Sequence, residues 1–239
     1  MPSTVYPLFR LLTGQSARLI LPATSAAALR RVRRLMALGG GWAPLARGVR
    51  SQRAVAGGVP AEWMAPAGVA SPAVLLYLHG GGWTLGLDPA HRILISHIAR
   101  AAGLRTLSLD YRLAPEHPFP AALDDCLAAY AWLQAQGYPG DRIVLAGDSA
   151  GANLALALAH ALSLRRQPLP AAVACLSGVF DLEFTGESFR TNADALLNPD
   201  YALAMVGHYA HGRNLRDPLI SPLWGDLSGF PPLSAIPNS

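Results

Sequence analysis

The residues with the clearest chemical potential are Gly147-Asp148-Ser149-Ala150-Gly151, which stand between an apolar segment and a helical segment. A serine in the pattern G-x-S-x-G between a strand and a helix is typical of a nucleophile elbow, whose tight turn lifts the hydroxyl above a sheet. A side chain at position 147 or 151 would collide with neighbouring backbone in such a turn. The free N–H groups at the start of the helix favour negative charge. Ser149 is therefore a candidate nucleophile.

A second candidate is the segment His79-Gly80-Gly81-Gly82-Trp83, which directly follows the apolar run from Ala73 to Leu78. Consecutive glycines let backbone N–H groups approach a substrate oxygen without obstruction, which is the geometry of an oxyanion hole. Taken alone, the segment could be a plain glycine turn. Both motifs, however, follow expected strands, and the carboxyl ends of strands in one sheet are where such folds place their sites. Together the motifs favour acyl transfer.

The elements that must position these motifs alternate between strand and helix. Strands are expected at 73–78, 106–109, 143–146 and 171–176, and helices at 90–102, 123–133 and 152–164. This alternation predicts an α/β fold with a mostly parallel sheet and helices on both faces. Shorter strand-like pieces around Gly57 and Gly58 predict a hairpin over 49–64.

The first 46 residues are compatible with helices and end in a run of glycines, so they are expected to be an appendage to the main fold. The net charge of +4 comes from arginine alone, because the sequence contains no lysine. The only dense basic cluster is Arg30, Arg31, Arg33 and Arg34, which alternates with apolar residues at helical spacing. We interpret this cluster as a solvated helix face and not as a nucleic-acid or membrane contact.

The composition predicts one large soluble domain with a small accessory piece, because the chain has 239 residues and 51% hydrophobic content. The longest apolar stretch, around Leu154 to Leu158, is too short to span a membrane. No secretion signal is recognisable at the N-terminus. Cys126 and Cys175 lie within an expected helix and an expected strand, which favours buried thiols over a disulfide. A cytoplasmic location is expected from these features.

Three motifs in order resemble those of the hormone-sensitive-lipase-like bacterial carboxylesterases, which have the α/β-hydrolase fold. They are HGGGW at 79–83, the segment YRLAPEHPFPAA at 111–122 followed by Asp124 and Asp125, and GDSAG at 147–151. The likeness extends from about residue 50 to residue 233. It implies N-terminal cap helices at 1–46 and a hydrolase core at 47–239, with a cap insertion at about 178–220 that covers the pocket.

The resemblance also implies roles for individual residues. The nucleophile would be Ser149, the oxyanion donors would be the N–H groups of Gly80, Gly81 and Ala150, and the supporting residues would be His79 and Asp148. Like His79, the 111–125 segment would brace the loops around the site. The implied substrate is a small ester or lactone that is cleaved through an acyl-serine intermediate without metal or cofactor. Oligomerisation is possible in this family, and no nucleic-acid partner is implied.

The sequence departs from the family pattern at its end. In the family, a segment like 221–233 leads into a further strand, followed by the triad aspartate and later the histidine, whereas here Ser234-Ala235-Ile236-Pro237-Asn238-Ser239 follows. Two strand and helix units, about 50 residues, are therefore expected to be missing. The strand at 171–176 is then expected to form an unprotected edge of the sheet.

Other histidines are poor substitutes for the missing base. The acid and the histidine follow the serine in this fold, and three histidines do so here. His160 lies farther along the same expected helix, roughly 16 Å from Ser149. His208 and His211, with Asp194 or Asp200, fall in the expected cap and are interpreted as ordinary cap surface. The expected function is thus a serine carboxylic ester hydrolase impaired in this form, and the alternative is a catalytically dead or ligand-binding remnant.

Overall fold

The computed structural model describes the chain except for residues 1–23, 40–43, 188, 190–198 and 237–239. Its centre is a seven-stranded sheet with the strand order β1-β2-β4-β3-β5-β6-β7. The strands are β1 (Val49–Ala56), β2 (Val59–Pro66), β3 (Val74–Leu78), β4 (Arg105–Leu109), β5 (Ile143–Asp148), β6 (Ala172–Leu176) and β7 (Leu233–Ile236). The first two strands form the predicted antiparallel hairpin, and β4, β3, β5, β6 and β7 are mutually parallel.

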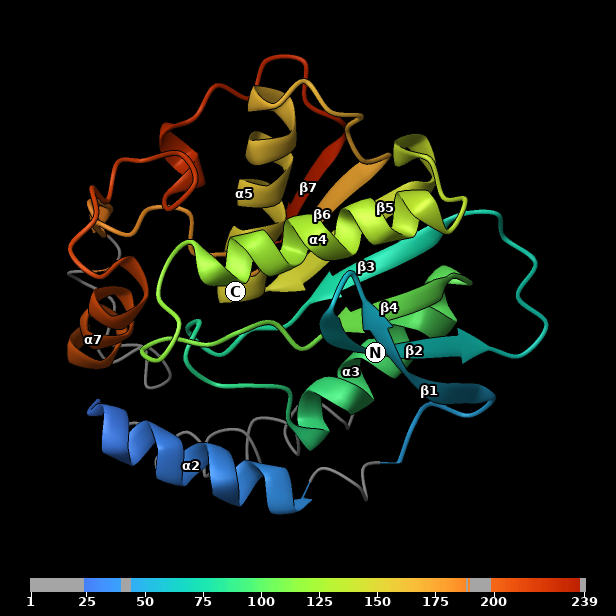
Figure 1. Ribbon diagram of the computed structural model, residues 1–239, viewed down its shortest axis with the longest axis horizontal. Helices are drawn as coiled ribbons and strands as arrows, with labels where there is room; N and C mark the ends of the chain where they lie inside the picture. Colours follow the sequence, from blue (N-terminus) through green and yellow to red (C-terminus); the bar gives the residue numbers. More distant parts are fainter. Residues whose placement is uncertain (1–23, 40–43, 188, 190–198, 237–239) are drawn as a thin grey trace.

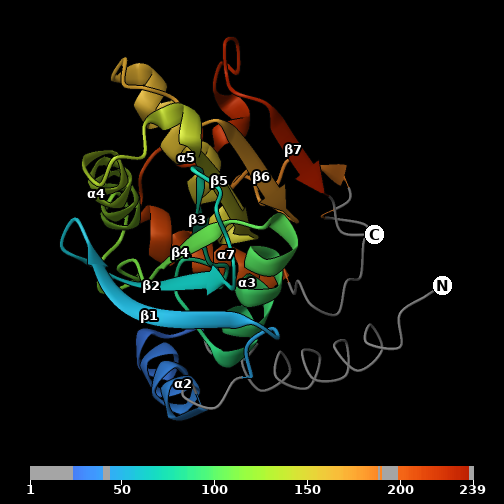
Figure 2. The same ribbon diagram turned by 90° about the vertical axis from the view of Figure 1, so that its right-hand side faces the viewer.

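Helices cover both faces of the sheet, as the sequence predicted. Alternate residues of β3 point to opposite faces, because side chains alternate along a strand. Leu76 and Leu78 belong to the core formed with α4 (Ala121–Ala135) and α5 (Ala150–Leu164), whereas Leu75 and Tyr77 pack with α3 (Pro89–Ala102). Figures 1 and 2 show α4 and α5 together on one side of the sheet and α3 on the other. Burial on both faces explains why β3 is a continuous apolar run.

The sheet differs from the sequence-based expectation at its last strand. β6 was expected to form an open edge, but β7 pairs with it in parallel, with Val173 opposite Leu233 and Leu176 opposite Ile236. Two backbone hydrogen bonds hold the ends of this pairing. The Val173 N–H donates to the Pro232 carbonyl, and the N–H of Ser177, the residue after β6, donates to the Ile236 carbonyl. These backbone bonds need no particular side chains, so the expectation of an unpaired β6 is wrong, and β7 is the edge of the described sheet.

Two further helices lie beside the ends of the strands, α2 (Ala26–Gly39) and α7 (Pro199–Ala210). They come from the two segments expected to form a cap. Leu29 of α2 and Met205 of α7 share a buried apolar cluster with Leu85, which follows the triple-glycine segment. Figure 1 shows α2 and α7 as neighbours despite their separation in sequence.

The described residues also form two short 3-10 helices, η1 (Gly140–Arg142) and η2 (Pro222–Trp224). Within the described ranges, no helix is both long and apolar enough to cross a membrane. Cys126 and Cys175 are buried free thiols, as the sequence predicted.

Candidate active site

The two glycine-containing motifs leave neighbouring strands at the same level. β3 pairs in parallel with β5, and Leu78 lies directly opposite Gly147 in this register. The 79–83 segment follows Leu78 and Ser149 follows β5, so the strand pairing alone brings the two loops side by side. This is the carboxyl end of the parallel strands, where open α/β sheets bind their ligands.

Ser149 lies in a strained turn between β5 and α5. Its φ of 51° and ψ of −117° are in a region that residues with side chains rarely adopt. A Cβ at Gly151 would meet the Leu78 carbonyl oxygen, and a Cβ at Gly147 would come within 2.6 Å of the same atom. The Ser149 N–H donates to the Leu176 carbonyl at 2.9 Å, whereas its side chain makes no capping bond to α5. The close approach of the two loops therefore requires both glycines.

A cavity of about 180 Å³ opens beside this turn. Ser149, Ala150 and Gly81 line it, so three of the residues predicted for the site meet at one wall. The other lining residues are Gly82, Trp83, Val179, Phe184, Tyr201, Ala202, Met205 and Val206, which come from the triple-glycine loop, the segment after β6 and α7. Gly82 belongs to the candidate triple-glycine segment but was assigned no role of its own, and the apolar wall was not predicted from the sequence.

The structure does not support the predicted oxyanion role of Gly80. Its N–H donates to Asp148 Oδ1 at 3.0 Å, and Gly80 is not among the residues that line the cavity. A Cβ at Gly80 would also meet the Asp148 carboxylate, so this glycine is required by the close approach of Asp148. This contact could not be predicted from the sequence, because the two residues are far apart in the chain.

His79 and Asp148, the predicted supporting residues, lie behind the cavity wall. His79 is fully buried, contacts the Gly80 carbonyl through Nδ1 at 2.7 Å and stacks on Tyr111 with ring centroids 4.2 Å apart. The Tyr111 hydroxyl donates to the His79 carbonyl at 2.6 Å, which joins the 111–125 segment to the start of the loop. Burial, together with the charge of nearby His91, lowers the pKa of His79 to about 4, so its ring is neutral at pH 7.

Asp148 is ionised although it is mostly buried. Burial acts to raise the pKa of its carboxyl, but the hydrogen bond and positive charge of His91, with donors from Tyr77 and Gly80, lower it below the ordinary value. The Tyr77 hydroxyl donates to Asp148 Oδ1 at 2.9 Å. His91 was not predicted from the sequence to belong to this region.

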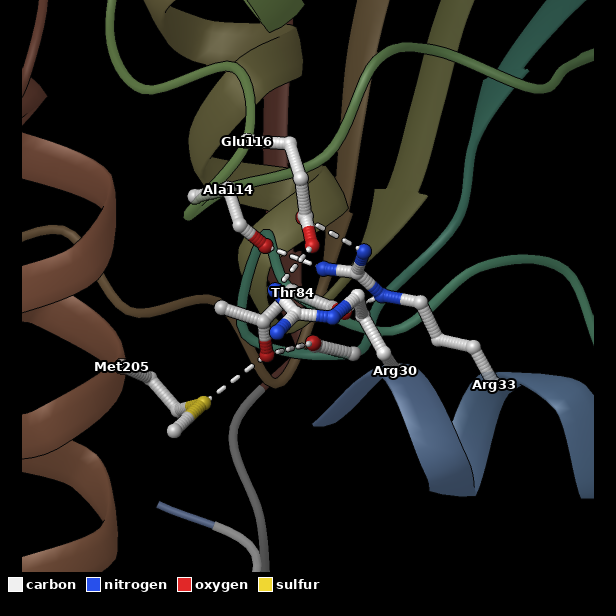
Figure 3. A network of polar contacts seen from close by, with 7 residues as sticks. Arg30, Arg33, Thr84, Ala114, Glu116 and Met205 are labelled. Carbon is white, nitrogen blue, oxygen red and sulfur yellow. Dashed lines mark hydrogen bonds and ion pairs between the residues drawn. The ribbon is translucent and has the colours of Figure 1, made fainter. Parts of the chain in front are cut away.

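Figure 3 shows how α2 contacts the triple-glycine loop. Arg33 Nε donates to the Thr84 carbonyl at 2.6 Å, and the same guanidinium bonds the Ala114 carbonyl and pairs with Glu116 at 2.7 Å. The Thr84 hydroxyl in turn contacts Met205 Sδ of α7 at 2.8 Å. The predicted solvated face is correct for the exposed Arg31 and Arg34, but wrong for Arg33. Arg33 follows Leu29 by one helical turn and so borders the buried side of α2.

All seven histidines lie in the described part of the chain, and none of them lines the Ser149 cavity. His160 faces away, with Nε2 3.2 Å from the Pro222 carbonyl and its ring against Phe230. His208 Nε2 contacts the Thr24 carbonyl at 2.6 Å. The rejection of His160, His208 and His211 as members of the site agrees with this lining, and Asp194 lies outside the described residues.

Residues 75–236 match a protein family described as having the alpha/beta hydrolase fold. Among curated proteins, an acetyl-hydrolase of Streptomyces hygroscopicus is 47% identical over 175 residues, which cover 72% of this chain and 58% of the relative. An esterase of Acinetobacter venetianus is 40% identical over 164 residues, which cover 66% of this chain and 54% of the relative.

Solved structures similar to this chain also include an esterase and a lipase. A crystal structure of an esterase from the bacterial hormone-sensitive lipase family superposes with a TM-score of 0.82 at 47% identity, covering 92% of this chain and 75% of that one. A hormone-sensitive lipase from a metagenome library superposes with a TM-score of 0.79 at 39% identity, covering 86% of this chain and 69% of that one. The chain thus spans somewhat more than half the length of the curated relatives that it matches.

Proposed function

Because this chain belongs to the bacterial hormone-sensitive-lipase-like esterases of the α/β-hydrolase family, we propose that it carries the nucleophile and oxyanion donors of a serine carboxylic ester hydrolase. The observation that carries this proposal is the shared cavity wall formed by Ser149, Ala150 and Gly81 at the ends of adjacent parallel strands. A nucleophile and backbone donors on one wall are what acyl transfer requires.

In the proposed reaction, Ser149 Oγ attacks the ester carbonyl carbon and loses its proton to a general base. The N–H groups of Gly81 and Ala150 stabilise the negative charge that develops on the carbonyl oxygen. Collapse of this intermediate breaks the carbon–oxygen bond to the alcohol, which leaves with the proton that the base returns. Water then attacks the acyl-serine by the same steps, releasing the acid and restoring the hydroxyl.

The cavity favours a short acyl or alcohol group. At about 180 Å³ it is small, and its walls are apolar side chains such as Val179, Phe184 and Val206. Burial of methylene groups stabilises binding, but only a few would fit in this space. We propose small esters, or lactones, as the substrate class. The segments around α2 and α7 would form the cap over the pocket.

The general base has no candidate on the described cavity wall, since neither a histidine nor a carboxylate lines it. We therefore propose that these 239 residues alone hydrolyse esters slowly. Measured triads that lose their base keep an acceleration of roughly three to four orders of magnitude over water, from binding and the oxyanion hole. The same observation favours a second candidate, a catalytically dead hydrolase that only binds esters.

The buried free thiols support a reducing, cytoplasmic location.

Hydrolysis of 4-nitrophenyl acetate tests the proposal. The unmodified chain should release 4-nitrophenolate above the rate of buffer and form an acetyl-enzyme, and Ser149→Ala should abolish the acetyl-enzyme while the acceleration from binding and the oxyanion hole remains. Ser163→Ala is a matched control, because Ser163 is exposed near the other end of α5. An acetyl-enzyme that still forms in Ser149→Ala would refute the assigned nucleophile. Ester binding without any excess rate would favour the ligand-binding alternative.

A further inference from the structure

A buried polar cluster lies behind the cavity wall, on the α3 side of the sheet. His91, in the first turn of α3, faces a carboxylate with each ring nitrogen: Nδ1 is 2.9 Å from Asp88 Oδ1, and Nε2 is 3.5 Å from Asp148 Oδ2. Carboxylates accept hydrogen bonds, and a neutral imidazole has only one N–H to donate. Two carboxylates on the two nitrogens therefore fit a doubly protonated ring.

Asp148 connects this ring to both loops of the proposed site. It immediately precedes Ser149, and its Oδ1 accepts the N–H of Gly80, which immediately precedes Gly81. The Tyr77 hydroxyl donates to the same oxygen. Because Gly80 leaves no room for a side chain beside this carboxylate, the contact is a close-packed one. A shift of the Asp148 carboxylate would thus move the triple-glycine loop relative to Ser149.

We propose that His91 is a positioning residue, whose imidazolium between Asp88 and Asp148 holds the Asp148 carboxylate on the Gly80 N–H and so fixes Gly81 relative to Ser149. The effect of His91 on catalysis rests on the proposed hydrolase function. The effect of His91 on the hydrogen bond between the Gly80 N–H and Asp148 is independent of that function.

The charged and titratable groups around His91 agree with this arrangement. Asp88 faces it from the N-cap of α3, Asp148 from the end of β5, and His79 from the loop after β3, with ring centroids 5.7 Å apart. Burial would lower the pKa of His91, but the hydrogen bonds and charges of the two carboxylates raise it to about 10. His79 is neutral, so one cation lies between two anions. Without that cation, the two carboxylates would repel each other in a poorly solvated site.

The experiment compares His91→Gln with His97→Gln, a matched control in which the exposed histidine of the same helix is changed. The primary measurement is amide hydrogen exchange at Gly80 by NMR. We expect exchange at Gly80 to become roughly tenfold faster or more in His91→Gln, while amides in α5 and β6 keep their protection. His97→Gln should match the unmodified protein. In addition, the ring nitrogens of His91 should both carry protons from pH 6 to about pH 9, as reported by their ¹⁵N shifts.

The activity measurement separates positioning from general damage. With 4-nitrophenyl acetate, His91→Gln should lower kcat and leave KM nearly unchanged, because the oxyanion contacts strengthen in the transition state. If His91→Gln fails to fold, Asp88→Asn removes one of the two carboxylates, keeps the ring, and should give an intermediate increase in Gly80 exchange. Unchanged Gly80 exchange in a folded His91→Gln, or a neutral His91 ring at pH 7, would overturn the inference. If the unmodified protein shows no Ser149-dependent acetylation, the proposed function fails, whereas Gly80 exchange still decides the role of His91.

Discussion

Arg33 Nε donates a 2.6 Å hydrogen bond to the Thr84 carbonyl oxygen, which joins an N-terminal helix to the loop beside the candidate nucleophile. The side chain of Arg33 is only 20% exposed, and its partners on Glu116 and Ala114 lie in the 111–125 segment. One guanidinium therefore holds together three parts of the chain that are far apart in sequence (Figure 3).

Arg33→Gln should destabilise the protein by about 2 kcal/mol, because carbonyl and carboxylate acceptors lose charged hydrogen bonds. Arg34→Gln, one residue further along the same helix and exposed, should change the free energy of unfolding little. Urea denaturation of both variants measures the difference. Equal stabilities for the two variants would show that the contacts of Arg33 contribute nothing net.

Gly151→Ala should lower the free energy of unfolding by about 3 kcal/mol or more, since the new methyl group would overlap backbone that cannot move away. The atom it meets is the Leu78 carbonyl oxygen of the adjacent strand. Gly207→Ala is the contrasting substitution, because Gly207 lies in α7 with nothing within 4 Å of an added Cβ. It should stabilise by roughly 0.5 to 1 kcal/mol through helix propensity. A well-tolerated Gly151→Ala would mean that the two loops are not in contact as described.

The pKa of His79 predicts how stability depends on pH. The folded protein holds this pKa near 4, below the ordinary value of 6.5. Between pH 6.5 and 4 the unfolded chain binds a proton at His79 more readily than the folded protein does. The stability contributed by the neutral His79 ring is therefore fully present above pH 6.5 and is lost as the pH falls from 6.5 to 4. The loss amounts to about 3 kcal/mol at pH 4.

His79→Gln provides the comparison, because glutamine does not titrate. The stability difference between the unmodified protein and this variant should shrink as the pH falls from 7 to 4. Denaturant midpoints at several pH values measure it, and a difference that stays constant across that interval would contradict a neutral, buried His79.

Phe184→Ala should shift substrate preference toward longer acyl chains. Phe184 lines the cavity of about 180 Å³, and truncating its ring adds space that further methylene groups can fill. The measurement is the ratio of kcat/KM for 4-nitrophenyl hexanoate to that for the acetate, which should rise by about tenfold. A ratio that is the same in both proteins would place the acyl group elsewhere.

Local sequence patterns were sufficient to predict most of the strands and helices of the core. The apolar run of β3 and the glycine-bounded turn at Ser149 are set by burial on two faces and by close backbone approach, and both can be recognised in short segments. The position of β7 was missed because a strand of only four residues is too short to show a clear period-two pattern. The hydrogen bond from the Gly80 N–H to Asp148 was missed for a different reason, because it depends on which strands are neighbours in the sheet.

Two side chains that contact residues around the candidate site, His91 and Arg33, carried only weak signals in the sequence. Asp88, three residues before His91, is a recognisable helix N-cap, but nothing local pairs His91 with Asp148. Arg33 differs from the neighbouring exposed arginines only in its angular position on α2. Long-range polar contacts of this kind require the fold to be known first.

The most direct test of the central claim is mass spectrometry of the protein after incubation with 4-nitrophenyl acetate. Ser149 beside the donors of Gly81 and Ala150 predicts one acetyl group on the peptide that contains residues 147–151, located at Ser149 and absent from Ser149→Ala. Acetylation found only at other residues, or the same adducts in both proteins, would contradict the role of Ser149 as nucleophile.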